Sequence, residues 1–156
     1  MSPKENLPLF HAESEEINDL AAKDAGKDGF TEMYVRNDNR VTLSDRKIKP
    51  SELEEILQTS ELEKSQAVTA GYGQSYREIR KRTIGFGKSY SAFYFDYDDG
   101  VVQHIWLTGL FGFDKDKLIK LLHQIGQKWN LILMDWNQTT PVDLQNKNDI
   151  ESYLTD

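Results

Sequence analysis

The sequence predicts an α+β domain with a single antiparallel or mixed sheet of about five strands and helices packed on at least one face. Three observations support this fold class: an aromatic β-hairpin over residues 91–110, a following helix with one apolar face, and a length of 156 residues that suits one ordinary core. We expect residues 1–8, which show no apolar periodicity, to form a flexible N-terminal tail, and residues 9–156 to form the domain.

The hairpin is the central element of the expected sheet. Its Asp99-Gly100 step signals a two-residue turn, because a type I′ turn needs positive φ angles at both central positions. Side chains alternate between the two faces along a strand, so the turn also assigns residues to faces. The predicted core face of the hairpin comprises Phe93, Phe95, Tyr97, Val102, His104 and Trp106.

Two helices are expected in the first half of the chain. Ser14 is placed to cap a helix that runs to Asp24. A second helix is expected to start at a capping box formed by Ser51 and Glu54, in which each side chain satisfies a backbone donor of the other. The apolar residues of this second helix are Leu53, Ile56 and Leu57.

Two more helices and a strand are expected after the hairpin. Asp114 caps a helix over residues 115–128, whose apolar residues recur every three or four positions. The apolar run 131–136 predicts a strand in a central position. Asn148 and Glu151 form another capping box, which predicts a short C-terminal helix.

The remaining segments give weaker signals. Residues 30–36 and 40–43 are typical of a hairpin around a polar Asn-Asp-Asn loop. Residues 75–82 are compatible with a strand or with a short helix. Gly85 and Gly87 indicate a break in the backbone just before the aromatic hairpin.

The charge and the residue types restrict the class of partner. The chain carries 26 acidic and 19 basic residues, a net charge of −7, which disfavours nucleic acid and anionic membranes and favours a cationic partner. The sequence has no apolar window of membrane-spanning length, and its start lacks the apolar centre of a signal peptide. With no cysteine in addition, we expect a cytoplasmic protein that needs no membrane.

No pattern predicts a catalytic set, a cofactor or a metal. The three histidines lack metal-ligand spacing, and no cysteine can complete a site. The segment Gly85-Phe-Gly-Lys-Ser89 resembles the end of a phosphate-binding loop, but Arg82 stands where that loop needs its first glycine. We therefore favour a binding protein over an enzyme.

Carboxylates gather around the hairpin and carry the leading hypothesis. Clustered carboxylates imitate phosphates and speed association with a basic surface. The hypothesis is a protein–protein interaction module, most concretely an immunity- or antitoxin-type inhibitor that binds a basic, nucleic-acid-cleaving or -binding partner such as a toxin. The candidate contact residues are Tyr94, Asp96, Asp98, Asp99, Asp114 and Asp116.

Two alternatives remain open at this stage, as does the oligomeric state. One is a small-ligand binder or an enzyme with a pocket formed by Tyr72, Tyr76, Arg80, His104 and Asp135. Asp135 belongs to this set because it interrupts an apolar strand, although a structural hydrogen-bonding role is favoured for it. The other alternative is a weak nucleic-acid binder that uses the basic segment 77–88.

Overall fold

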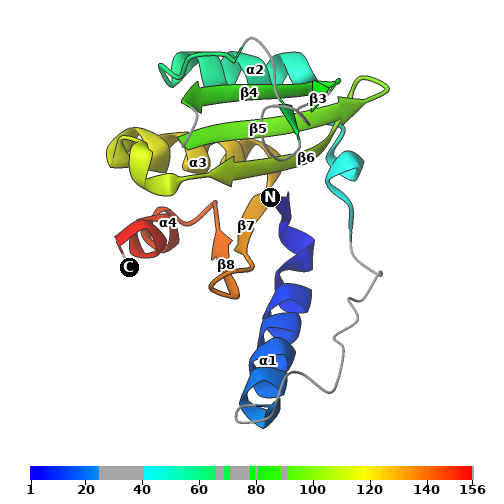
Figure 1. Cartoon of the computed structure of the whole chain (residues 1–156), viewed down its shortest axis with the longest axis vertical. Helices are drawn as coiled ribbons and strands as arrows, with labels where there is room; N and C mark the ends of the chain where they lie inside the picture. The colour runs from blue at the N-terminus through cyan, green and yellow to red at the C-terminus, as the bar shows by residue number, and fades with distance from the viewer. Residues whose placement is uncertain (25–40, 66–68, 71–77, 80, 89–90, 156) are drawn as a thin grey trace.

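The structure, a computed structural model, describes residues 1–24, 41–65, 69–70, 78–79, 81–88 and 91–155. These residues form an α+β fold with two three-stranded antiparallel sheets, ordered β1-β7-β8 and β4-β5-β6, and a short β2-β3 pair (Figure 1). The strands are β1 (Ser2–Pro3), β2 (Thr69–Ala70), β3 (Glu78–Ile79), β4 (Thr83–Lys88), β5 (Ser91–Asp98), β6 (Val101–Thr108), β7 (Leu131–Asp135) and β8 (Thr140–Asp143). The helices are α1 (Leu7–Asp24), α2 (Pro50–Thr59), α3 (Lys115–Trp129) and α4 (Lys147–Thr155), with 3-10 turns η1 (Lys4–Asn6), η2 (Leu43–Arg46) and η4 (Leu110–Gly112).

The predicted single sheet of about five strands is wrong. β7 lies between β1 and β8 in a sheet of its own, and the hairpin strand β6 forms an edge of the other sheet. Groups from elsewhere in the chain already occupy that edge: the Val102 amide donates to the Ile48 carbonyl at 2.9 Å, and the Met1 amine donates to the Ile105 carbonyl at 2.6 Å. These contacts leave β7 no room to pair along β6.

The register of β5 and β6 also differs from the prediction. Asp99 and Gly100 have φ angles of 51° and 73°, as a type I′ turn requires. The two pairs next to the turn match the predicted register, but the register then shifts so that Asp96 faces His104. Gln103 is the extra residue, and it forms a β-bulge.

The bulge changes which side chains of β6 face the core. A shift by one residue moves every later side chain to the other face. Ile105 is therefore buried, whereas His104 is exposed and Trp106 is only partly buried. The prediction that His104 and Trp106 lie on the core face is wrong. The buried residues of this sheet include Phe86, Phe93, Phe95, Val102 and Ile105.

The core is continuous between the two sheets and the helices. On one side of the β4-β5-β6 sheet, α2 and α3 contribute fully buried side chains, including Leu53, Leu57, Leu122 and Ile125. The same cluster continues through Leu131 of β7 and Ile150 of α4 (Figure 1). Leu53, Ile56 and Leu57, the apolar residues of the expected helix, are buried.

The predicted starts of the first two helices are less accurate than the prediction that these helices exist. α2 begins at Pro50 without a side-chain cap, so the predicted box of Ser51 and Glu54 is wrong. Proline suits this first position because its missing N–H has no partner inside the helix. α1 begins at Leu7, which leaves Ser14 buried in the middle of the helix rather than at its cap.

For the two later helices, the predicted caps lie closer to the caps in the structure. The Asp114 carboxylate accepts a hydrogen bond from the Lys117 amide at 3.0 Å, so the predicted cap of α3 is confirmed. At α4 the cap lies two residues before the predicted one, because the side chain of Asn146 accepts from the Asn148 amide at 3.1 Å. β8 has no counterpart in the prediction.

Gly85 and Gly87 belong to β4 rather than to a break before the hairpin. Gly87 has a φ angle of 123°, and a Cβ built on it would lie 2.3 Å from the Ser91 carbonyl oxygen. Only glycine fits such a close approach of two strands. The glycines therefore permit tight pairing of β4 with β5. The hairpin predicted at 30–36 and 40–43 is described only at residues 41–43, where Leu43 begins η2 instead of continuing a strand. Within 75–82, residues 78–79 form the short strand β3 and residues 81–82 form a turn before β4, whereas the others lie outside the described residues.

Residues 1–8, expected to be a flexible tail, take part in regular structure. Ser2 and Pro3 pair with β7, and the Lys4 amide donates to the Asn130 carbonyl at 2.9 Å. The Lys4 ammonium contacts Asp143 at 3.0 Å, beside β8. The first six residues therefore contact both sheets, since the Met1 amine also bonds to β6.

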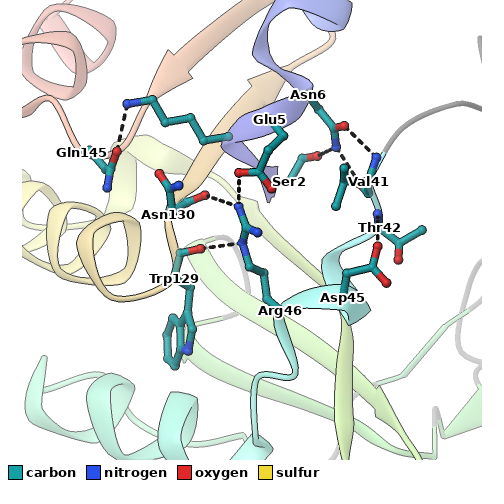
Figure 2. Close-up of polar contacts among 11 residues, drawn as sticks. Ser2, Glu5, Asn6, Val41, Thr42, Asp45, Arg46, Trp129, Asn130 and Gln145 are labelled. Carbon is teal, nitrogen blue, oxygen red and sulfur yellow. Dashed lines mark hydrogen bonds and ion pairs between the residues drawn. The ribbon is translucent and has the colours of Figure 1, made fainter.

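Arg46 fixes this N-terminal segment against the end of α3 (Figure 2). Its guanidinium donates to the carbonyls of Trp129 and Asn130 at 2.8 and 3.2 Å, and it pairs with the Glu5 carboxylate. A cation is favourable here because the carbonyls at a helix C-terminus carry partial negative charge. Arg46 therefore holds η1, η2 and α3 together.

We predict that Gly126→Ala destabilises the fold, although alanine normally favours a helix. A Cβ at this α3 position would lie 2.4 Å from both the Cβ and the carbonyl oxygen of Leu144, so the packing before α4 must shift. Such overpacking typically costs about 1–3 kcal/mol of unfolding free energy. Urea unfolding measures the change. Gln127→Ala, at an exposed position of the same helix, is the control.

We also predict a pH-dependent contribution from Glu5. The hydrogen bond from Arg46 holds the pKa of this carboxyl below its usual 4.5, against a smaller opposing effect of burial. Its stabilising contribution is therefore complete above pH 4.5 and is lost as the pH falls through the lowered pKa. The stability difference between the wild-type chain and Glu5→Gln should be constant from pH 7 to 5 and shrink below it. A difference that grows on acidification would contradict the assignment.

Candidate functional site

Two aromatic rings stack on the outer face of the β4-β5-β6 sheet. Tyr94 of β5 faces Trp106 of β6, and their ring centroids lie 5.5 Å apart with the planes at 23°. Both residues are partly exposed. On the other side of Tyr94, the paired residue of β4 is Gly85, which adds no side chain to this face. The bulge creates the stack, because without it Trp106 would point into the core.

A carboxylate and an imidazole lie next to the stacked rings. Nδ1 of His104 is 2.9 and 3.0 Å from the two carboxylate oxygens of Asp96, its cross-strand partner. The side chain of His104 is 74% exposed and that of Asp96 is 22% exposed. We define the outer-face cluster as Tyr94, Asp96, His104 and Trp106.

The chemistry of the outer-face cluster favours recognition. A carboxylate that orients an imidazole also occurs in hydrolytic triads, where the second ring nitrogen activates a hydroxyl. Within the described residues, no hydroxyl hydrogen-bonds the other nitrogen of His104. A flat, partly exposed aromatic pair beside a charge is typical of a binding surface.

The predicted contact residues lie at both ends of the hairpin. Asp98 forms an exposed ion pair with Arg82, and Asp99 occupies the type I′ turn. Asp114 and Asp116 follow the other end of the hairpin, where Asp114 caps α3 and Asp116 is exposed. Eight-residue strands separate these ends by roughly 23 Å. The structure therefore brings Tyr94 and Asp96 together and keeps Asp114 and Asp116 apart from Asp98 and Asp99.

The structure does not bring together His104 and Asp135, the two described residues of the alternative pocket. His104 belongs to the outer-face cluster, whereas Asp135 ends β7 in the other sheet. Tyr72, Tyr76 and Arg80 lie outside the described residues.

Asp135 has a local structural role. One carboxylate oxygen accepts from the amides of Asn137 and Gln138 at 2.9 and 3.2 Å, and the other accepts from the Tyr153 hydroxyl at 2.7 Å. Such side-chain bonds to the following amides stabilise a turn. Burial, and secondarily the bond to Asp135, raise the pKa of Tyr153 above its usual value. No pattern in the sequence identifies Tyr153 as the partner of Asp135, because the two residues are 18 positions apart on different elements.

The basic segment 77–88 is described in part, at residues 78–79 and 81–88. Arg82 is paired with Asp98, which offsets its charge, and Lys81 is exposed. Among the described residues, no group of histidines and carboxylates is arranged to hold a metal ion. No helix in the described ranges is long and apolar enough to cross a membrane.

We predict that the Tyr153–Asp135 contact stabilises the junction of β7 and α4. Tyr153→Phe removes one hydrogen bond and should cost about 1 kcal/mol of unfolding free energy. Asp135→Ala also leaves two turn amides without their acceptor and should cost more, about 2 kcal/mol. Urea denaturation of both variants, with Ser152→Ala as an exposed control, measures the difference. Equal stabilities of the three variants would contradict this role.

Comparisons with known proteins assign no relative to this chain. No protein-family model matches it, and neither the curated proteins nor the solved structures contain a significant match.

Proposed function

We propose that this protein is an acidic protein–protein interaction module that binds a basic partner. The contact surface is the outer-face cluster together with the neighbouring turn carboxylates Asp98 and Asp99. In its most concrete form the protein is an immunity- or antitoxin-type inhibitor of a nucleic-acid-cleaving or -binding protein. The observation that carries the proposal is the partly exposed Tyr94–Trp106 stack beside these carboxylates.

The combination of aromatic rings and carboxylates suits such an interface. Tyrosine and tryptophan supply large contact areas at a low entropic cost and dominate the energy of many interfaces. Asp98 and Asp99 lie about 13 Å along the strand from Tyr94, close enough for one partner to reach both. A net charge of −7 adds long-range attraction toward a basic cleft.

The edges of the sheet favour binding through its face. On the β4 side, the Ser65 amide donates to the Gly85 carbonyl and the Gly87 amide donates to the Glu63 carbonyl, both at 2.7 Å. On the β6 side, Ile48 and Met1 occupy backbone groups. A partner strand would have to displace these contacts, since strand addition needs a free edge.

The test begins with capture of the partner from the source cells, with co-expression of the products of adjacent genes. Three variants then separate the contributions to affinity. Tyr94→Ala should weaken binding about thirtyfold or more if the stack is an anchor. Asp99→Asn should reduce the association rate a few-fold at low salt and less at high salt, because it removes a charge but tolerates the same turn conformation. Asp116→Asn tests whether the other end of the hairpin also contacts the partner.

Glu55→Gln, on the exposed side of α2, is the charge-matched control and should leave the affinity unchanged. Spectra of each free variant check that the fold is intact. A captured partner whose affinity is unchanged by both Tyr94→Ala and Asp99→Asn would disprove this surface. Recovery of the protein without any basic partner would disprove the proposed class.

A further inference from the structure

A hollow of about 250 Å³ opens between η4, the start of α3 and α4, away from the outer-face cluster. In Figure 1 this region lies where the yellow start of α3 approaches the red α4. Its walls are mainly apolar, formed by Leu110, Phe113, Leu118 and Leu154. Two polar side chains, Lys115 and Gln138, also line it.

Among the described residues that line this hollow, Lys115 is the only charged one. Its ammonium donates to the Thr155 hydroxyl at 2.9 Å, which orients it and uses one of its three N–H groups. The remaining donors can face an anion at the mouth of the hollow. The Gln138 side chain supplies an uncharged amide that can also donate.

Tyr153 forms another wall, and its polar atom is already engaged. The hydroxyl donates to Asp135 at 2.7 Å, so the ring is available as an apolar surface. This wall is uncharged at physiological pH, as for any tyrosine, and burial raises the pKa of Tyr153 further above its usual value of 10.0. The Asp135 carboxylate is itself held by two backbone amides and is not a lining residue.

Two neighbouring hollows differ from the hollow at Lys115 in the charged residues that line them. The one of about 270 Å³ that shares Tyr153 and Gln138 contains Asp149 and no cation. The one of about 160 Å³ contains Glu61 and Asp114 beside Lys117, which is already paired with Glu61. If the described residues alone are counted, the hollow at Lys115 is the one of these three whose lining contains a cation and no carboxylate.

We propose that the hollow at Lys115 binds a small monocarboxylate with an apolar body. The carboxylate contacts the Lys115 ammonium, and the apolar body lies against Leu118 and Leu154. Sites for drug-sized ligands occupy about 300–1,000 Å³, so a hollow of about 250 Å³ suits a molecule of the size of a medium-chain fatty acid. This site does not depend on the proposed partner surface, which lies on a different part of the fold.

The test uses octanoate as the probe, with octanol and octylammonium as matched neutral and cationic probes. Backbone amide shifts of the isotope-labelled full chain locate binding. Octanoate should shift amides of residues 110–118 and 150–155 in a saturable manner, and octylammonium should not. Equal binding of the anion and the cation, or octanoate shifts confined to other regions, would overturn the proposal.

Lys115→Gln separates the contribution of the charge from that of the apolar walls. It should weaken octanoate binding about fivefold, as expected for an exposed ion pair, and leave octanol binding unchanged. Lys120→Gln, on the same helix and outside the hollow, is the matched control and should change the octanoate affinity less than twofold. Equal affinities of the two variants for octanoate would also overturn the proposal, because both positions are exposed and unfolding curves of the two variants control for an effect on the fold.

Discussion

The N-terminal six residues connect the two sheets, and the arrangement of the fold depends on this connection. The Met1 amine bonds to β6, whereas Ser2 and Pro3 extend the other sheet beside β7. Arg46 then joins the neighbouring turn to the C-terminal carbonyls of α3. Each of these groups contacts backbone polar atoms that would otherwise need water or another partner. The Met1 amine and the Ile48 carbonyl also occupy backbone groups on the edge of β6, and the chain forms two three-stranded sheets instead of one wide sheet.

A single extra residue determines the chemistry of the exposed face. The bulge at Gln103 turns His104 and Trp106 outward, where they meet Asp96 and Tyr94 across the hairpin. Ile105 takes the place in the core. Phe93 and Phe95 stay buried, and the extra residue adds a partly exposed aromatic pair beside a charged pair on the outer face. Bulges frequently re-aim side chains at functional sites in this way, and the proposed partner surface follows from this one.

The charged groups of the protein serve two different purposes. Asp114 and Asp135 form hydrogen bonds within the fold: Asp114 caps α3, and Asp135 bonds to turn amides and to Tyr153. Asp99 and Asp116 remain exposed, and their positions at opposite ends of the hairpin extend the negative potential along the molecule. Lys115 differs from these groups, because the described lining of its mainly apolar hollow contains no carboxylate. The amino-acid composition therefore does not distinguish carboxylates that bond within the fold from carboxylates that are exposed to a partner.

The sequence alone is enough to predict the α+β class, the apolar face of α3 with its Asp114 cap, the helix that carries Leu53, Ile56 and Leu57, and the type I′ turn. These features depend on interactions between residues close together in the chain, so periodicity and turn chemistry are enough to predict them. Only the tertiary structure decided the division into two sheets, the ordered position of residues 1–6, the outward direction of Trp106 and the contact of Tyr153 with Asp135. Each of these depends on partners distant in the chain or on a bulge, for which the local pattern of apolar residues carries no signal.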